Sequence, residues 1–226
     1  MAFDFGFDFN FSGKAAEEAP ETEEKNEKEE KQAYIRSFTE RGKKIFDKKR
    51  FFSERAMLEA VDWHFQPGYE YHCMSGGDVD SLSYLKHVVR QQPLEYLSIS
   101  TWCIGIQDVH EIKEWIKKGL VKRFDCYLGE IAKASYAQAQ TDLEKITGKT
   151  GGRCGIFRNH SKVMCCYGEK FDCVILSSAN VNTNPRTENT VIVCDSEITD
   201  FYKSFYDDIK PFNGSPENWT PYIRKK

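Results

Sequence analysis

Apolar positions recur along the chain with two different periods. Between residues 32 and 65 they follow helical intervals, which predicts a helix that Gly42 divides in two. From residue 69 onward, short apolar runs alternate with amphipathic stretches of helical length. The expected strands are 69–74, 94–103, 123–131 and 153–157, and the expected helices are 79–90, 107–120, 135–146 and 198–209. This alternation predicts an α/β fold with a mixed, mostly parallel sheet and helices on both faces.

The last two expected strands form a hairpin that turns at 167–170. Alternate side chains of a strand share one face, so His160 and Lys162 point the same way, and so do Ser178 and Asn180. A tight turn would place His160 roughly opposite Ser178, with cross-strand neighbours about 5 Å apart at Cβ. The pattern therefore predicts an imidazole, an ammonium, a hydroxyl and an amide around a patch the size of one phosphate.

The spacing of these side chains resembles the signature of the phospholipase D superfamily, His-x-Lys-x4-Asp-x6-Gly-Ser-x-Asn. The chain matches it with His160-Ser161-Lys162, Ser177-Ser178-Ala179-Asn180 and a later Glu188. It departs from the signature at two positions, because Tyr167 stands at the aspartate and Ser177 at the glycine. In the family the aspartate mostly supports structure. The order of elements is similar to the family's domain from residue 69 to about residue 209.

The resemblance implies a metal-independent phosphodiesterase without a cofactor. His160 would attack phosphorus to form a phosphohistidine, and Lys162 would stabilise the charge on the phosphate. Ser178 and Asn180 would donate hydrogen bonds to phosphate oxygens, and Glu188 would orient an imidazole. A single imidazole cannot easily act as both nucleophile and acid, and the chain carries one copy of the signature. A homodimer that presents two His160 side chains to each other is therefore implied.

Short members of the family that carry one signature resemble nucleases more than lipid hydrolases. We therefore expect a nuclease that acts on DNA or RNA, with lipid hydrolysis ranked below it. Arg158 and Arg186 either add phosphate contacts or are ordinary surface charges. Lys48 and Lys49 belong to a basic segment that either follows a nucleic-acid backbone or is a solvated helix face.

The alternative from a different class is a catalytically weak or inactive module that binds nucleic acid or acts as a scaffold. It rests on the two departures from the signature and on the N-terminal tail, which a protein partner would recruit. The tail begins MAFDFGFDFNFS, and five Phe in a short polar segment favour a docking motif over a merely mobile end.

Charge is spread unevenly along the 226 residues. Residues 1–31 hold ten acids and four lysines, a net charge of −6, while the whole chain carries −3. The remainder is therefore mildly basic, at +3. Four parts follow: an acidic, Phe-rich, disordered tail (1–31), a basic helical extension (32–68), a phospholipase D-like domain (69–210) and a C-terminal tail (211–226).

No apolar run is long enough to cross a membrane, and the N-terminus lacks the apolar core of a signal peptide. The eight cysteines form no CxxC pair, which favours buried free thiols in the cytoplasm over a zinc site or disulfides. The remaining histidines lack neighbours from the signature and are expected to be surface or core residues: His64, His72, His87 and His110.

Overall fold

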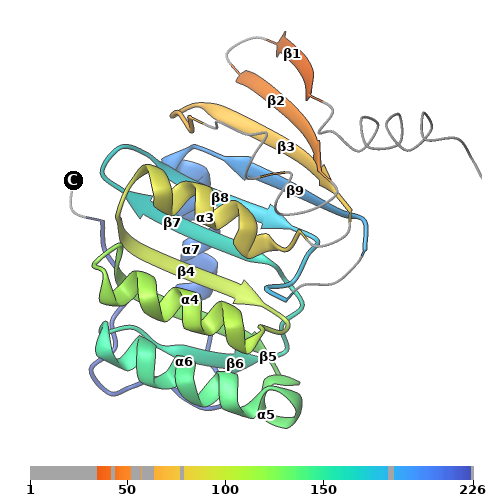
Figure 1. Ribbon diagram of the computed structural model, residues 1–226. Coiled ribbons are helices and arrows are strands. Elements are labelled where there is room, and N and C mark those ends of the chain that lie inside the picture. Colours follow the sequence, from red (N-terminus) through yellow and green to blue (C-terminus); the bar gives the residue numbers. More distant parts are fainter. Residues whose placement is uncertain are drawn as a thin grey trace, which may run out of the picture. The chain divides into compact units, whose positions relative to one another are not determined.

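The structure, a computed structural model, describes residues 35–41, 44–51, 57, 64–76, 79–182 and 186–224 (Figure 1). These residues belong to one compact unit, Ala33–Lys226. The expected acidic tail at 1–31, with its Phe-rich start, lies outside the described residues.

A nine-stranded sheet is the centre of this unit, in the order β1-β2-β3-β9-β8-β7-β4-β5-β6 (Figure 1). Its strands are β1 (Ile35–Arg41), β2 (Lys44–Phe51), β3 (Tyr69–Ser75), β4 (Leu94–Thr101), β5 (Val121–Gly129), β6 (Cys154–Phe157), β7 (Val163–Gly168), β8 (Asp172–Ser177) and β9 (Glu188–Val193). The late strands β7, β8 and β9 lie between the early strands β3 and β4. Residues far apart in the sequence therefore meet in the middle of the sheet.

The expected α/β fold with a mixed sheet is confirmed, but the sheet is less parallel than the helix spacing suggested. Three strand pairs are parallel, namely β2–β3, β4–β5 and β5–β6. The other five are antiparallel. The difference arises because β7, β8 and β9 are inserted between β3 and β4, where they form antiparallel pairs with each other and with both neighbours.

The helix expected at 32–65 is wrong over 35–41 and 44–51, because β1 and β2 are strands, whereas Met57 is helical. Arg41 pairs with Lys44 in an antiparallel ladder, and only two residues lie between them in the sequence. Such a short connection suits a hairpin. β2 also pairs with β3, which supplies hydrogen-bond partners for its backbone. The helical period of the sequence does not reveal such a distant pairing.

Helices cover both faces of the sheet, as expected (Figure 1). They are α3 (Ser81–Gln91), α4 (Ile106–Lys117), α5 (Ala132–Ser135), α6 (Ala137–Lys149) and α7 (Ser196–Asp207). Two of them begin at an aspartate cap, since Asp80 accepts from the backbone of Ser83 and Asp195 from that of Ile198. No helix in the described ranges combines the length and apolar character that crossing a bilayer requires.

Two apolar cores fill the two faces. Along β7, Met164 and Cys166 point into the core under α3, α4 and α6, while Cys165 and Tyr167 point into the core under α7. This alternation is the period-2 pattern of a strand buried on both sides. The expected buried free thiols are confirmed, because all eight cysteines are buried and free.

The C-terminal segment closes the core under α7 instead of extending as a polar tail. Tyr222 stacks on Tyr96 with ring centroids 4.5 Å apart, and Arg224 forms an ion pair with the buried Asp172 at 2.6 Å. The indole of Trp219 donates to Asp125 at 3.1 Å. The segment therefore belongs to the folded unit.

Arg153 ties this segment to the end of α7. Its side chain, with 2% exposure, donates to the carbonyls of Tyr206 at 2.6 Å and Ile209 at 3.2 Å and to the hydroxyl of Ser215 at 2.8 Å. Its guanidinium also lies 3.5 Å from the centre of the Trp219 ring. A buried cation thus satisfies the carbonyl end of a helix, where positive charge is favoured.

Asp108, in the first turn of α4, makes the stability depend on pH. Burial, and then the negative charge of Asp80, raise the pKa of Asp108 from 3.8 to about 7. The folded chain holds this proton up to about pH 7, whereas the unfolded chain releases it near pH 4. Between these values the folded state binds more protons, so stability falls as pH rises.

We expect Asp108→Asn to remove this dependence. The stability advantage of the variant should grow by about 1–2 kcal/mol between pH 5 and pH 8, after a discount for partial solvent exposure. Urea unfolding at the two pH values measures it, with the exposed Asp208→Asn as a control whose effect stays constant. An advantage of Asp108→Asn that is equal at both pH values would contradict the assignment.

Candidate active site at the ends of β7 and β8

The β7–β8 hairpin has a register one residue away from the expected one. Tyr167 pairs with Asp172, so the turn comprises residues 168–171 and not 167–170. Continuation of this ladder places Ser177 opposite Lys162, whose carbonyl accepts from the Ser177 amide at 3.0 Å. His160 consequently does not face Ser178 across a regular ladder. The signature residues converge because they lie just beyond the strand ends, where side chains from both strands turn toward one pocket.

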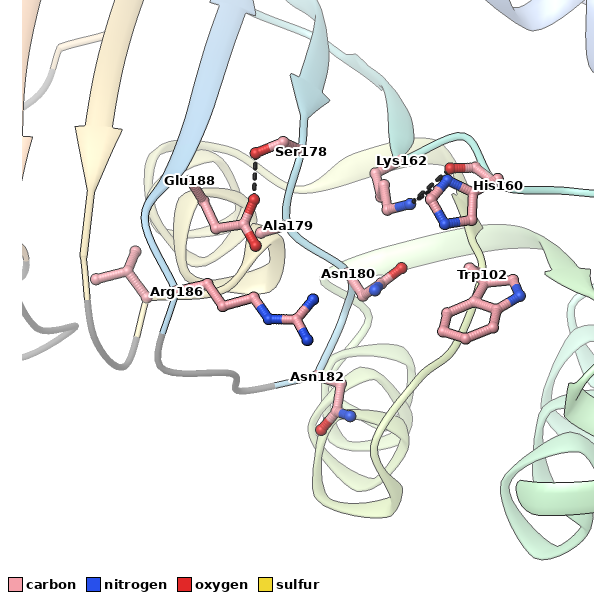
Figure 2. A pocket seen from close by; sticks show the side chains of 10 residues that line it. Trp102, His160, Lys162, Ser178, Ala179, Asn180, Asn182, Arg186 and Glu188 are labelled. Atoms are coloured by element: carbon pink, nitrogen blue, oxygen red, sulfur yellow. Dashed lines mark hydrogen bonds between the residues drawn. The ribbon is translucent and has the colours of Figure 1, made fainter. Parts of the chain in front are cut away.

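A pocket of ≈ 120 Å³ lies at this end of the sheet (Figure 2). All five predicted catalytic residues line it: His160, Lys162, Ser178, Asn180 and Glu188. The same lining includes Arg186 and four residues that the sequence did not single out, namely Val79, Trp102, Ala179 and Asn182. The structure thus brings together side chains that are up to 109 positions apart, from Val79 to Glu188.

His160 and Lys162 form the polar centre of the pocket. The ammonium of Lys162 lies 3.1 Å from Nδ1 of His160 and donates to the His160 carbonyl at 2.6 Å (Figure 2). The carbonyl uses one of its three N–H groups, which leaves the others for an anion or the imidazole. The His160 side chain is exposed.

The stem of Lys162 is buried, and this affects its charge. Burial lowers the pKa of Lys162, whereas the negative charges of nearby groups, Glu188 among them, oppose the shift. Because water around the ammonium is limited, its attraction to a bound anion is screened less than it would be in bulk solvent.

Asn159 holds the loop that carries His160. Its amide nitrogen donates to the hydroxyl of Ser100 at 2.9 Å and to the carbonyl of Tyr127 at 3.0 Å. Its oxygen accepts from the amide of Ser161 at 3.0 Å and from the hydroxyl of Ser161 at 2.6 Å. With 3% exposure, Asn159 anchors the chain to β4 and β5 directly before the imidazole. It is a positioning residue.

Ser178 and Glu188 contact each other, in a way that differs from the role expected for Glu188. The hydroxyl of Ser178 donates to the Glu188 carboxylate and accepts from the amide of Asn189 at 3.0 Å. Glu188 begins β9, which neighbours β8, whereas His160 precedes β7 on the other side of β8. Because of this strand order, Glu188 contacts Ser178 and does not contact the His160 imidazole.

Asn180 is held in a loop that contacts two helix starts. Its carbonyl accepts from the amide of Ser81 at 3.4 Å, and the next carbonyl, of Val181, accepts from Gly105 at 2.8 Å. The hydroxyl of Thr101 lies 3.5 Å from the Asn180 amide oxygen. The Asn180 side chain is partly exposed and faces the pocket (Figure 2).

The four expected substrate-binding residues fall in different places. Arg186 lines the pocket and is exposed. Arg158 is exposed but does not line it. Lys48 and Lys49 lie in β2, which β3 and β9 separate from β8. The structure therefore joins only Arg186 to the catalytic group.

Tyr167, at the aspartate position of the signature, lies in the core at the other end of β7. It is 1% exposed and donates to Asp200 of α7 at 2.6 Å. A structural role suffices for this position, and the substitution leaves the pocket lining intact.

Trp102 is the largest pocket residue that sequence analysis missed. Its ring centroid lies 5.6 Å from that of His160, at an interplanar angle of 47°. The end of the apolar strand 94–103 gave no sign that this residue leaves the core, because strand periodicity does not reveal where a loop begins. Gly129 makes room for it, since a Cβ there would lie 2.5 Å from the Trp102 ring and 2.8 Å from the Asn159 carbonyl.

Within the described residues, His, Cys, Asp and Glu side chains form no cluster of three or more that is placed to hold a metal ion.

No protein-family model and no curated protein matches this chain. Among solved structures, a polyphosphate kinase from Porphyromonas gingivalis is similar at 13% identity and a TM-score of 0.45, over 60% of this chain and 25% of that one. A phosphatidylserine synthase from Haemophilus influenzae Rd KW20 is similar at 15% identity and a TM-score of 0.42, over 61% of this chain and 37% of that one. The matched region is thus a quarter to under two-fifths of each of those proteins.

Proposed function

We propose that this protein cleaves phosphodiesters through a phosphohistidine intermediate and that its substrate is a nucleic acid. One observation carries the proposal: an exposed imidazole lies 3.1 Å from a partly buried ammonium in a pocket lined by amides and of about the size of a phosphate. The match of these residues to the phospholipase D signature supports the same chemistry.

The first step forms a bond between His160 and phosphorus. Nε2 of His160 attacks, the bond from phosphorus to the leaving oxygen breaks, and that oxygen takes a proton from an acid. Lys162 and the Asn180 amide neutralise the charge that develops on the non-bridging oxygens. Nε2 has its lone pair free for this attack when the imidazole proton is on Nδ1, the nitrogen that lies beside Lys162.

The acid in this step is the His160 of a second copy of the chain. In the second step the same imidazole takes a proton from water, the water oxygen attacks phosphorus, and the bond between phosphorus and nitrogen breaks. The exposure of His160 supports this arrangement, because a two-fold partner can approach it directly. The Glu188 of one copy could then orient the imidazole of the other.

Nucleic acid is proposed because the chain offers one additional cation in the pocket and others outside it. Arg186 lies in the pocket lining and can bind a neighbouring phosphate. Arg158, Lys48 and Lys49 are proposed to contact phosphates farther along the strand. Such contacts would make binding weaken steeply as salt concentration rises.

A second candidate is a binding module with little or no activity. The observation in its favour is the bond from Ser178 to Glu188, which occupies the hydroxyl proton and places a carboxylate in the pocket. That carboxylate would repel a phosphate, and this repulsion would slow the attack of His160 on phosphorus. Salt-sensitive binding without cleavage would support this candidate.

Hydrolysis of bis(p-nitrophenyl) phosphate by the purified protein separates the two candidates. We expect cleavage that persists in excess EDTA, because the proposed steps use only imidazole and ammonium groups. Loss of activity in EDTA with recovery on adding Mg²⁺, Mn²⁺ or Zn²⁺ would contradict the mechanism. Sedimentation should give the mass of two chains, and an active monomer would remove the second imidazole from the reaction.

A further inference from the structure

We infer that Trp102 stacks on the nucleobase next to the scissile phosphate, which makes a single strand the substrate. This inference rests on the proposed function and specifies its substrate class. It assigns Trp102 to specificity, whereas His160 and Lys162 perform the chemistry.

The position of Trp102 carries the argument. Its indole is partly exposed, lines the pocket and lies beside His160, on the opposite side from Glu188 and Arg186 (Figure 2). The centroid separation of 5.6 Å from the imidazole places the ring within about one nucleotide of a phosphate bound at Nε2.

The indole packs against Gly129, and the chain on either side of it is fixed by further contacts. At Gly129 even a methyl group would clash with the ring. The hydroxyl of the preceding residue, Thr101, donates to the carbonyl of Cys103 at 2.8 Å. Two residues later, Ile104 forms a bridge with Val181. An aromatic ring that is fixed before binding loses little conformational freedom when a ligand stacks on it.

The pocket is too small for more than the reacting phosphate. Its ≈ 120 Å³ leaves the sugar and base on either side of the phosphate to lie on the rim. The rim offers the flat face of Trp102 and the amide of Asn182. Stacking suits any base, and an amide can donate to or accept from a base edge.

A base can use this platform only when its own face is free. In a duplex, both faces of each base are covered by its neighbours, so a base must be unstacked before it reaches a protein ring. Single strands meet this requirement at little cost, which favours them over duplexes.

Other phosphate-containing substrates fit the rim less well. A lipid needs an apolar surface beside the pocket, but the most exposed apolar side chains of α7, Phe201 and Phe205, are not among its lining residues. A polyphosphate chain needs a row of cations and has no flat face, whereas the lining of this pocket includes the carboxylate of Glu188 beside its two cations. An aromatic platform matches a base better than either of these.

Calorimetric binding of two short strands tests the inference. One is oligothymidylate, and the other has the same length but carries abasic sites, so the two differ only in bases. Each titration uses a His160→Asn background, which prevents consumption of the strand. We expect the intact strand to bind about 5- to 150-fold more tightly, the range expected from stacking of one base. In Trp102→Ala this ratio should fall toward one, and in Trp102→Phe most of it should remain.

Phe201→Ala is the matched control, because it removes an exposed aromatic ring outside the pocket and should leave the ratio unchanged. A ratio near one in the parent protein, or a high ratio that survives in Trp102→Ala, would overturn the inference. A duplex that binds as tightly as the single strand would overturn the preference for single strands. Cleavage of bis(p-nitrophenyl) phosphate reports separately on the proposed function, so each can fail without the other.

Discussion

His160→Ala is expected to reduce diester hydrolysis by about 10³-fold or more, because it removes the proposed nucleophile from one copy and the proposed acid from the other. The change affects kcat more than KM, since Lys162, Asn180 and Arg186 still bind the phosphate. Steady-state rates with bis(p-nitrophenyl) phosphate at several pH values measure the effect.

His110→Ala is the control for this substitution. His110 is exposed on α4 and does not line the pocket, so its replacement should leave the rate unchanged. Residual activity within about tenfold of the parent protein would show that His160 takes no covalent part, because loss of a nucleophile costs far more than loss of a hydrogen bond. Trapping a phosphorylated His160 during turnover would provide direct support.

Arg153→Met is expected to lower the free energy of unfolding by about 3 kcal/mol or more. Methionine fills much of the space but cannot donate to the carbonyls of Tyr206 and Ile209, which lose their charged partner. It also loses the contact of a cation with the Trp219 ring. Equilibrium unfolding in urea measures the effect.

Arg158→Met provides a matched comparison, because it makes the same chemical change at an exposed position. Its effect on stability should remain within about 0.5 kcal/mol. Equal effects of the two substitutions would mean that the buried hydrogen bonds of Arg153 contribute no more than a surface charge does.

The sequence was sufficient to predict the centre of the site but not its geometry. His160, Lys162, Ser178, Asn180 and Glu188 share one pocket, as expected. The pairing of His160 with Ser178 was wrong, because turn length sets the register and the turn begins one residue later than its sequence suggested. The partner of Glu188 depends on strand order, which local spacing does not contain.

Features that depend on distant contacts were missed. The strands β1 and β2 carry residues with a helical period but pair with a sheet edge instead. Trp102 and Asn182 belong to no signature, and only the folded chain places them beside His160. Most elements from residue 69 onward were predicted within a few residues, because their apolar periods are strong and their burial is deep.

The segment at 211–224 has a consequence for biosynthesis. Tyr222, Trp219 and Arg224 complete the core under α7, and they are translated after every strand and helix described here. The part of the sheet face on which Tyr222 stacks, at Tyr96, therefore remains uncovered until these residues leave the ribosome. During that interval the nascent chain exposes aromatic surface that favours association with other chains, so chaperones are expected to bind it at this late stage.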